Sequence, residues 1–130
     1  MSLDPHNLLA KVEPDLVKTL TKAYDGTFVV VYGIRTIQEE QQAIKTGHST
    51  TMHSRHLPDT KGLSAAVDVA SVSANGQPSW APGHEQPVFG LIATKVKQAA
   101  QERNIPVEWG GDWLTFKDWG HFQLPWKEYP

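Results

Sequence analysis

The sequence contains no cysteine among its 130 residues. A thiol nucleophile, a disulfide framework and a zinc site with thiolate ligands are therefore excluded. A transition-metal site in this chain must use histidine and carboxylate ligands instead. Six histidines and 14 acidic residues are present to provide them.

An excess of charge of either sign is also missing. Twelve basic and 14 acidic residues give a formal net charge of -2, so charge does not favour nucleic acid or an anionic membrane as a partner. The longest apolar run, residues 28–32, is far shorter than the roughly 20 residues that cross a bilayer. The first residues lack a basic region followed by an apolar stretch, so we expect no signal peptide and a cytoplasmic start.

Length and composition predict one globular domain spanning residues 1–130. Hydrophobic residues make up 39% and charged residues 20% of the chain, which is an ordinary balance for a folded protein. A chain of this length can enclose one core. No repeat, low-complexity tract or linker divides the sequence.

Hydrophobic spacing and turn residues predict helices mixed with separated strands, an α+β fold. We expect helices after residue 5 and at 13–24, 36–45 and 87–104, and strands at 27–32, 65–72, 106–109 and 120–124. Thr36 and Glu39 fit a capping box at the start of a helix, and Gly47 should end that helix. Residues 47–64 and 71–83 are expected to be loops.

Asp68 is the first residue that points to chemistry. It lies between Val67 and Val69 in a stretch of alanine and valine. If its carboxylate is buried, it must be paired, hydrogen-bonded or bound to a metal, because an unpaired buried charge is strongly unfavourable. The period of a strand equally allows Asp68 to face the solvent.

Two segments with histidine add further candidates. Asp118 lies three residues before His121, and an acid beside a histidine ligand can take a proton from an activated water. His53 and His56 lie in the expected loop at 47–64. Singly, each is more often a surface acid or an ordinary histidine. Together the segments offer two histidines and a carboxylate, which is the ligand set of many catalytic zinc sites.

The order of these motifs resembles the family of zinc D,D-carboxypeptidases and L-alanyl-D-glutamate endopeptidases (VanY-like enzymes), in particular its phage endolysins. That family carries Ser-x-His, then Gly-x-Ala-x-Asp, then an acid shortly before a last histidine. This chain has Ser54-Arg55-His56, Ser64 to Asp68, and Asp118 to His121. Its residues 33–36 match the family's Gly-x-Arg-Thr element, and residues 108–113 and 121–124 are similar to phage members.

The resemblance implies a small antiparallel sheet flanked by helices, a fold also seen in hedgehog domains. It implies that His56, Asp68 and His121 bind Zn²⁺. Asp118 would be the general base, and Arg35 would stabilise the oxyanion.

Further positions follow from the resemblance with a less direct role. The Ser-x-His motif favours His56 over His53 as the ligand. Ser54 and Gln41 would support the ligands or contact the substrate. The tryptophans at 109, 113 and 119 could line the cleft, although at least one should belong to the core.

The path between the first two ligands departs from the family pattern. The step from His56 to Asp68 is twelve residues, longer than in the family's compact motif, so residues 57–62 are expected to form an inserted loop. The family glycine is Ser64 here, so we expect the tight turn at Gly62.

The implied substrate is the stem peptide of bacterial peptidoglycan. The short single domain, without a separate wall-binding domain, favours a monomeric phage endolysin that cuts the L-Ala–D-Glu bond. It would be made in the host cytoplasm and act in the periplasm on the cell wall during lysis. Two alternatives stay open: a D-Ala-D-Ala carboxypeptidase of the same fold, and a non-catalytic zinc-containing hedgehog-like binding module. Asp118 argues against the second.

Overall fold

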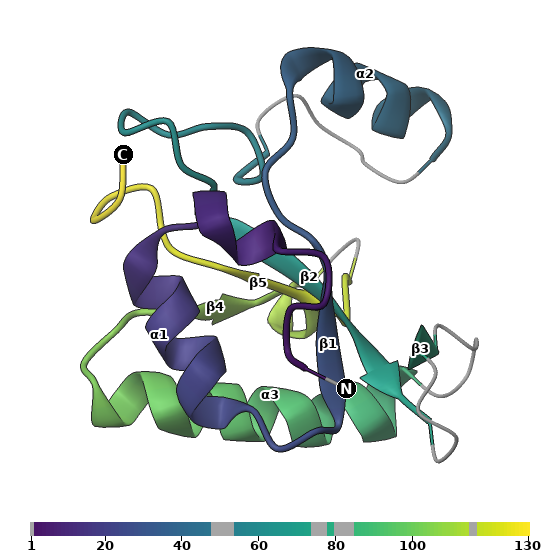
Figure 1. Ribbon diagram of the computed structural model, residues 1–130, viewed down its shortest axis with the longest axis vertical. Helices are drawn as coiled ribbons and strands as arrows, with labels where there is room; N and C mark the ends of the chain where they lie inside the picture. Colours follow the sequence, from purple (N-terminus) through teal and green to yellow (C-terminus); the bar gives the residue numbers. More distant parts are fainter. Residues whose placement is uncertain (1, 48–53, 74–77, 80–84, 115–116) are drawn as a thin grey trace.

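The computed structural model describes residues 2–47, 54–73, 78–79, 85–114 and 117–130 (Figure 1). Helices and strands alternate along the chain in the mixed order expected of an α+β fold. The elements are η1 (Leu8–Lys11), α1 (Pro14–Ala23), β1 (Phe28–Tyr32), α2 (Ile37–Lys45), β2 (Ala66–Val72), β3 (Pro78–Ser79), α3 (Glu85–Glu102), β4 (Glu108–Trp109), η2 (Gly110–Asp112) and β5 (His121–Gln123). None of these helices is long and apolar enough to cross a membrane.

The sheet is antiparallel and has the strand order β1-β2-β5-β4, with β3 added to the end of β2. Strand β2 is the centre, because β1, β3 and β5 all pair with it. Its register sets Asp68 directly opposite His121 on β5 and next to Tyr32 on β1. The small antiparallel sheet is therefore confirmed, and its pairing brings two of the expected ligands together.

The core lies between this sheet and the helices α1 and α3, which pack side by side on one side of it (Figure 1). Val67 and Val69 point into that core and are fully buried. Because successive side chains of a strand point to opposite faces, Asp68 between them points away from the core. The apolar residues of β2 thus hold the acid on the opposite face of the sheet.

Helix α2 begins and ends as its residues predict. Thr36 Oγ1 accepts a hydrogen bond from the Glu39 N–H at 3.1 Å, and Glu39 Oε1 accepts one from the Thr36 N–H at 2.9 Å. Thr46 ends the helix, and Gly47 follows at φ +80° with its N–H bonded to the Ile44 carbonyl. The capping box and the terminal glycine are both confirmed.

Two expectations about local structure are refined by the fold. The short helix expected after residue 5 is present as the 3₁₀ helix η1, whose first N–H groups, of Leu8 and Leu9, bond to the Asp4 carboxylate. The expected loop at 71–83 begins inside β2 and contains β3, which pairs with Ser71 and Val72. A two-residue strand is too short to leave a hydrophobic period in the sequence.

Gly120 allows the close approach of β5 to β2 and gives a test of this packing. A Cβ atom at Gly120 would lie 2.4 Å from the Val69 carbonyl oxygen, whereas one at Gly90 on α3 meets no heavy atom within 4 Å. Gly120→Ala should lower the free energy of unfolding by about 1–3 kcal/mol. Gly90→Ala, the matched control, should raise it by about 0.5–1 kcal/mol through helix propensity. Urea unfolding measures both, and a Gly120→Ala variant as stable as wild type would contradict the register.

Candidate metal centre

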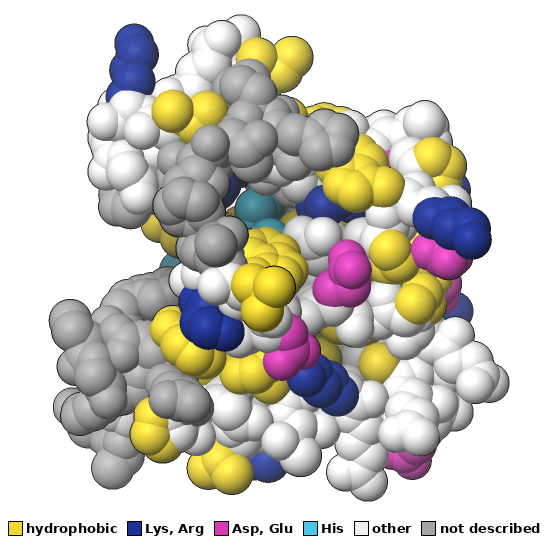
Figure 2. All heavy atoms as spheres, turned by 180° about the vertical axis from the view of Figure 1, so that it is seen from behind, with side chains coloured by type: hydrophobic (Ala, Val, Ile, Leu, Met, Phe, Trp, Pro, Cys, Tyr) yellow, Lys and Arg dark blue, Asp and Glu magenta, His cyan; other side chains and the backbone are white. Residues whose placement is uncertain are grey.

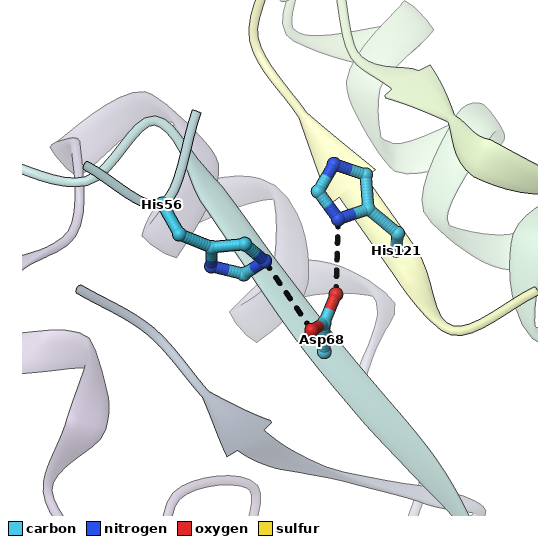
Figure 3. Close-up of side chains that lie close together, drawn as sticks. All are labelled: His56, Asp68 and His121. Carbon is cyan, nitrogen blue, oxygen red and sulfur yellow. Dashed lines mark hydrogen bonds and ion pairs between the residues drawn. The ribbon is translucent and has the colours of Figure 1, made fainter. Parts of the chain in front are cut away.

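Three buried side chains from distant parts of the chain converge on one point (Figure 3). His56 comes from the segment before β2, Asp68 from β2 and His121 from β5. His56 Nε2 lies 3.2 Å from Asp68 Oδ2, and His121 Nδ1 lies 2.9 Å from Asp68 Oδ1. One ligand atom of each residue lies within 4.8 Å of the others. This spacing suits a single metal ion.

The hydrogen bond of His56 fixes which ring nitrogen faces the site. Its Nδ1 lies 2.7 Å from the Gly33 carbonyl oxygen. Because a carbonyl only accepts, Nδ1 carries a proton, and Nε2 is the ring nitrogen that faces the site and can offer a lone pair to a metal. Nε2 is buried, points toward Asp68 and has no hydrogen-bond partner among the described residues. A buried ring nitrogen of this kind is a position that a metal ion would fill.

The His121 ring is held so that its Nδ1, and not its Nε2, faces Asp68. Its Nε2 lies 2.8 Å from Gln123 Oε1, and the Gln123 amide nitrogen donates to Glu108 Oε1 at 3.1 Å. The donation to Glu108 turns the amide oxygen toward the ring, so His121 Nε2 carries a proton and Nδ1 faces Asp68. The two histidines therefore fit a metal through different atoms, Nε2 of His56 and Nδ1 of His121.

Charged neighbours counteract the effect of burial on the pKa values of Asp68 and His121. Burial raises the pKa of Asp68, but the nearby charge of His56 and the hydrogen bond from His121 outweigh it and hold that pKa below its usual range. Burial lowers the pKa of His121, but the hydrogen bond to Asp68 and its charge raise it overall. The pair with Asp68 thus favours a proton on His121, and a metal bound through Nδ1 would compete with that proton.

Asp118 lies at the open side of the site. Its Oδ2 is 3.9 Å from His121 Nδ1, and about half of its side chain, 51%, is exposed to solvent. Partial desolvation and then the negative charge of Asp68 raise the pKa of Asp118. Asp118 is thus a stronger base than an ordinary surface aspartate, and it is accessible. Figure 2 shows histidine side chains at the bottom of a hollow in the surface.

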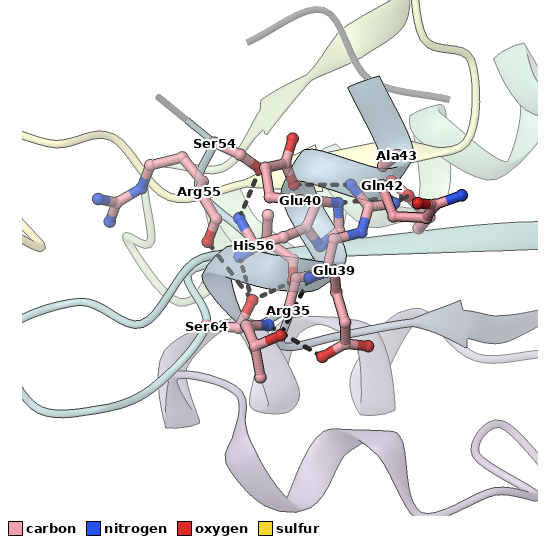
Figure 4. Close-up of polar contacts among 12 residues, drawn as sticks. Arg35, Glu39, Glu40, Gln42, Ala43, Ser54, Arg55, His56 and Ser64 are labelled. Carbon is pink, nitrogen blue, oxygen red and sulfur yellow. Dashed lines mark hydrogen bonds and ion pairs between the residues drawn. The ribbon is translucent and has the colours of Figure 1, made fainter. Parts of the chain in front are cut away.

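Arg35 brings a cation to the same site (Figure 4). Its Nη2 lies 3.8 Å from Asp68 Oδ2, and its Nη1 donates to Glu40 Oε2 at 3.1 Å. The backbone N–H of Arg35 bonds to the His56 carbonyl at 2.8 Å. Glu40 is fully buried, so this ion pair fixes the guanidinium beside the three ligands.

Comparison with known proteins places the chain in a family. The model of the family described as phage L-alanyl-D-glutamate peptidase matches residues 1–121. The chain belongs to this family. The L-alanyl-D-glutamate peptidase of Escherichia phage T5 is 30% identical over 117 residues, covering 85% of this chain and 79% of that protein. The crystal structure of the Serratia marcescens L-Ala D-Glu endopeptidase ChiX superimposes with a TM-score of 0.79 at 38% identity, covering 95% of this chain and 87% of that one. The family and the fold expected from the motifs are both confirmed.

The segment that carries His56 in this peptidase is clamped by the last residues of the chain. The Arg55 side chain is buried and donates to the backbone carbonyls of Leu124 and Tyr129. Its guanidinium also stacks on Trp126, 3.9 Å from the ring centroid. Because Arg55 directly precedes His56, these contacts hold the first ligand in place.

Residues 57–62, which the sequence analysis expects to be an inserted loop, form a tight turn. The Asp59 N–H bonds to the Leu63 carbonyl at 2.8 Å and the Gly62 N–H to the Asp59 carbonyl at 2.9 Å. Gly62 has φ +78°, as expected of the residue that replaces the family's glycine turn. Thr60 Oγ1 also donates to the Pro130 carbonyl at 2.8 Å. These hydrogen bonds close the segment between His56 and Asp68 into a turn.

The other expected site residues differ in where the structure places them. Ser54 is buried, and its Oγ accepts a hydrogen bond from the His56 N–H at 3.1 Å (Figure 4), so it shapes the loop. Gln41 is exposed on α2, and its assignment stays a prediction. His53 lies outside the described residues. The Trp113 ring packs 5.1 Å from that of His121.

Two supporting residues escaped the sequence analysis although patterns mark them. Gln123 is two residues after His121 in a strand, so both side chains point to the same face. Glu40 shares the buried face of α2 with Ala43, three residues later. An acid at a buried helix position requires a cation, which here is Arg35.

The pair of Asp68 and His121 predicts how the stability of the metal-free peptidase depends on pH. The lowered pKa of Asp68 adds stability above its unfolded value of about 3.9, and this is lost as the pH falls through the folded value. The raised pKa of His121 adds stability below its unfolded value of about 6.5, lost as the pH rises through the folded value. The wild type should therefore exceed Asp68→Asn in stability most between about pH 4 and 6.5. Urea unfolding in EDTA measures the difference, and a difference independent of pH would contradict the pairing.

Gln123 gives a separate test of the histidine orientation. Gln123→Ala removes the acceptor for His121 Nε2 and should weaken metal binding by roughly 10- to 100-fold. Calorimetric titration of a divalent metal into the metal-free protein measures the affinity. Gln101→Ala, the same change at an exposed position of α3, is the control and should bind metal as the wild type does. Equal affinities for both variants would show that Gln123 does not orient the ligand.

Proposed function

We propose that this peptidase is a zinc-dependent phage endolysin that hydrolyses the L-Ala–D-Glu bond of the peptidoglycan stem peptide. The observation that carries the proposal is the orientation of the ligands. His56 Nε2 and His121 Nδ1 face one carboxylate, while their other nitrogens are held by the protein. Two imidazoles and one carboxylate, without any cysteine, are a ligand set of catalytic zinc sites that keep a fourth position open.

The names of the relatives support the choice of bond. Both the phage T5 protein and ChiX are named for the L-Ala–D-Glu linkage. Action on the cell wall after release from the host cytoplasm, as one catalytic domain and as a monomer, remains part of the proposal. These inferences rest on the resemblance of the sequence to phage endolysins.

The side chains around the metal centre divide the reaction between them. His56, Asp68 and His121 would hold the zinc ion, which would supply Lewis acidity to polarise the scissile carbonyl and activate the attacking water. Asp118 accepts the proton of that water and then delivers it to the leaving amine of D-Glu. Arg35, held by Glu40, presents a cation to the oxygen that gains negative charge as the carbonyl becomes tetrahedral.

Replacing the base separates catalysis from metal binding. Asp118→Asn should retain one zinc per chain and lower the rate of hydrolysis by roughly 10²- to 10⁴-fold, because proton transfer is lost. Zinc content by plasma mass spectrometry and the rate of peptide cleavage are the two readouts. Asp25→Asn, in the exposed turn before β1, is the matched control and should leave both unchanged. Full activity in Asp118→Asn would remove the assigned base.

The bond that is cut decides between the endopeptidase and its alternatives. Purified peptidoglycan digested by the zinc-loaded protein should release peptides that begin with D-Glu, detected by mass spectrometry. Release of terminal D-Ala would show a carboxypeptidase instead. Intact muropeptides with zinc bound would show a binding module.

A further inference from the structure

A groove separate from the three ligands lies between the first half of α3 and the turn η2. It has a volume of about 720 Å³, a size typical of sites for small molecules. Two indole side chains and two charged side chains are among the groups that line it. The lining residues are Pro87, Gly90, Trp109, Gly111, Asp112, Lys117 and Trp119.

This groove shares its walls with the metal centre. Trp119 directly follows Asp118, the proposed base. Gly110, which precedes the groove residue Gly111, is so close to the site that a Cβ there would lie 3.1 Å from the His121 Cβ and 3.0 Å from the Asp118 Cβ. A substrate whose scissile bond lies at the metal centre therefore has its neighbouring groups at the groove, because adjacent residues are only about 3.8 Å apart.

The floor of the groove is aromatic, and its polar groups are at the rim. The rings of Trp109 and Trp119 lie 5.7 Å apart, and the Trp109 indole N–H donates to the Trp119 carbonyl at 2.8 Å. Because this N–H is already bonded, Trp109 offers a ligand mainly carbon surface. Lys97 and Asp112 pair at 2.6 Å, and Lys117 donates to the Gly111 carbonyl at 3.0 Å.

This combination fits a sugar ring better than a peptide side chain. A pyranose has an apolar face of C–H groups, which stacks on aromatic rings, and an edge of hydroxyl and amide groups, which bonds to polar residues. Lys97 and Asp112 neutralise each other, so of the residues named here only Lys117 keeps a net charge, and its ammonium can donate hydrogen bonds to hydroxyl or amide oxygens. The charged groups of the stem beyond D-Glu would find a counter-charge only at Lys117 among the residues named here.

We propose that this groove binds the N-acetylmuramyl sugar that carries the stem peptide; the proposal rests on the proposed function. In peptidoglycan the L-Ala of the stem is joined to the lactyl group of that sugar. The sugar ring is therefore separated from the L-Ala–D-Glu bond by L-Ala and the lactyl group, about two residue lengths or roughly 7 Å. The methyl side chain of L-Ala is too small to fill the groove, and the sugar ring is the next large group along the substrate.

The test compares two substrates that differ only in the sugar. One is the free tripeptide L-Ala–D-Glu–diaminopimelate, and the other is the same peptide on N-acetylglucosaminyl-N-acetylmuramic acid. The wild type should have a kcat/KM roughly tenfold higher for the second substrate, from contact with the aromatic floor. Trp119→Leu should lose most of this preference, measured as the ratio of its two kcat/KM values, because any effect on the adjacent Asp118 changes both values alike.

A second variant, at the edge of the groove, tests the proposal if Trp119→Leu does not fold. Lys117→Ala changes an exposed side chain and should lower kcat/KM for the sugar-bearing substrate alone. Lys127→Ala, an equally exposed lysine away from the groove, is the control and should change neither value. Equal cleavage of both substrates by the wild type would overturn the proposal. So would an equal loss on both substrates in Trp119→Leu or Lys117→Ala, or a preference that disappears when diaminopimelate is removed.

Failure of the proposed function is distinguishable from failure of the groove. If neither substrate is cut, the peptidase assignment fails. The disaccharide alone is then titrated into the protein, with tryptophan fluorescence as the readout. Saturable binding that Trp119→Leu abolishes would support the groove, and no binding would overturn it.

Discussion

The burial of one carboxylate, Asp68, is the constraint on which the site depends. Strand β2 is the centre of the sheet, and the core needs Val67 and Val69 on the face toward the helices. The acid between them must then face the opposite side, where it is almost completely covered by protein. A buried negative charge is tolerated only with compensation. His56, His121 and Arg35 all approach its two oxygens within 3.8 Å and provide that compensation.

Each group around Asp68 is in turn fixed by a different part of the chain. His56 is bonded to the carbonyl at the end of β1 and follows the clamped Arg55. His121 is oriented by Gln123, and Arg35 is held by Glu40 on α2. A metal ion bound there would meet side chains whose orientations are already set, so little conformational entropy would be lost on binding. Asp118, the proposed general base, is left half exposed.

Much of this arrangement could be predicted from the sequence because it depends on local patterns. The capping box at Thr36, the apolar run of β1 and the period of α3 each report their own conformation. The ordered motifs led to His56, Asp68 and His121. Contacts between distant segments produce no local sequence pattern. The clamp on Arg55 joins residues about 70 positions apart, and β3 is too short to show a period. Gln123 and Glu40 lay on faces that the strand and helix periods mark, yet their importance depends on partners from other segments.

The central claim is that a metal ion joins His56, Asp68 and His121, with the two histidines ligating through different nitrogens. A crystal structure of the zinc-loaded protein, with anomalous diffraction recorded on both sides of the zinc absorption edge, tests this most directly. The account predicts one strong anomalous peak in contact with His56 Nε2, His121 Nδ1 and a carboxylate oxygen of Asp68. A peak elsewhere, or His121 bound through Nε2 with Gln123 turned away, would contradict it.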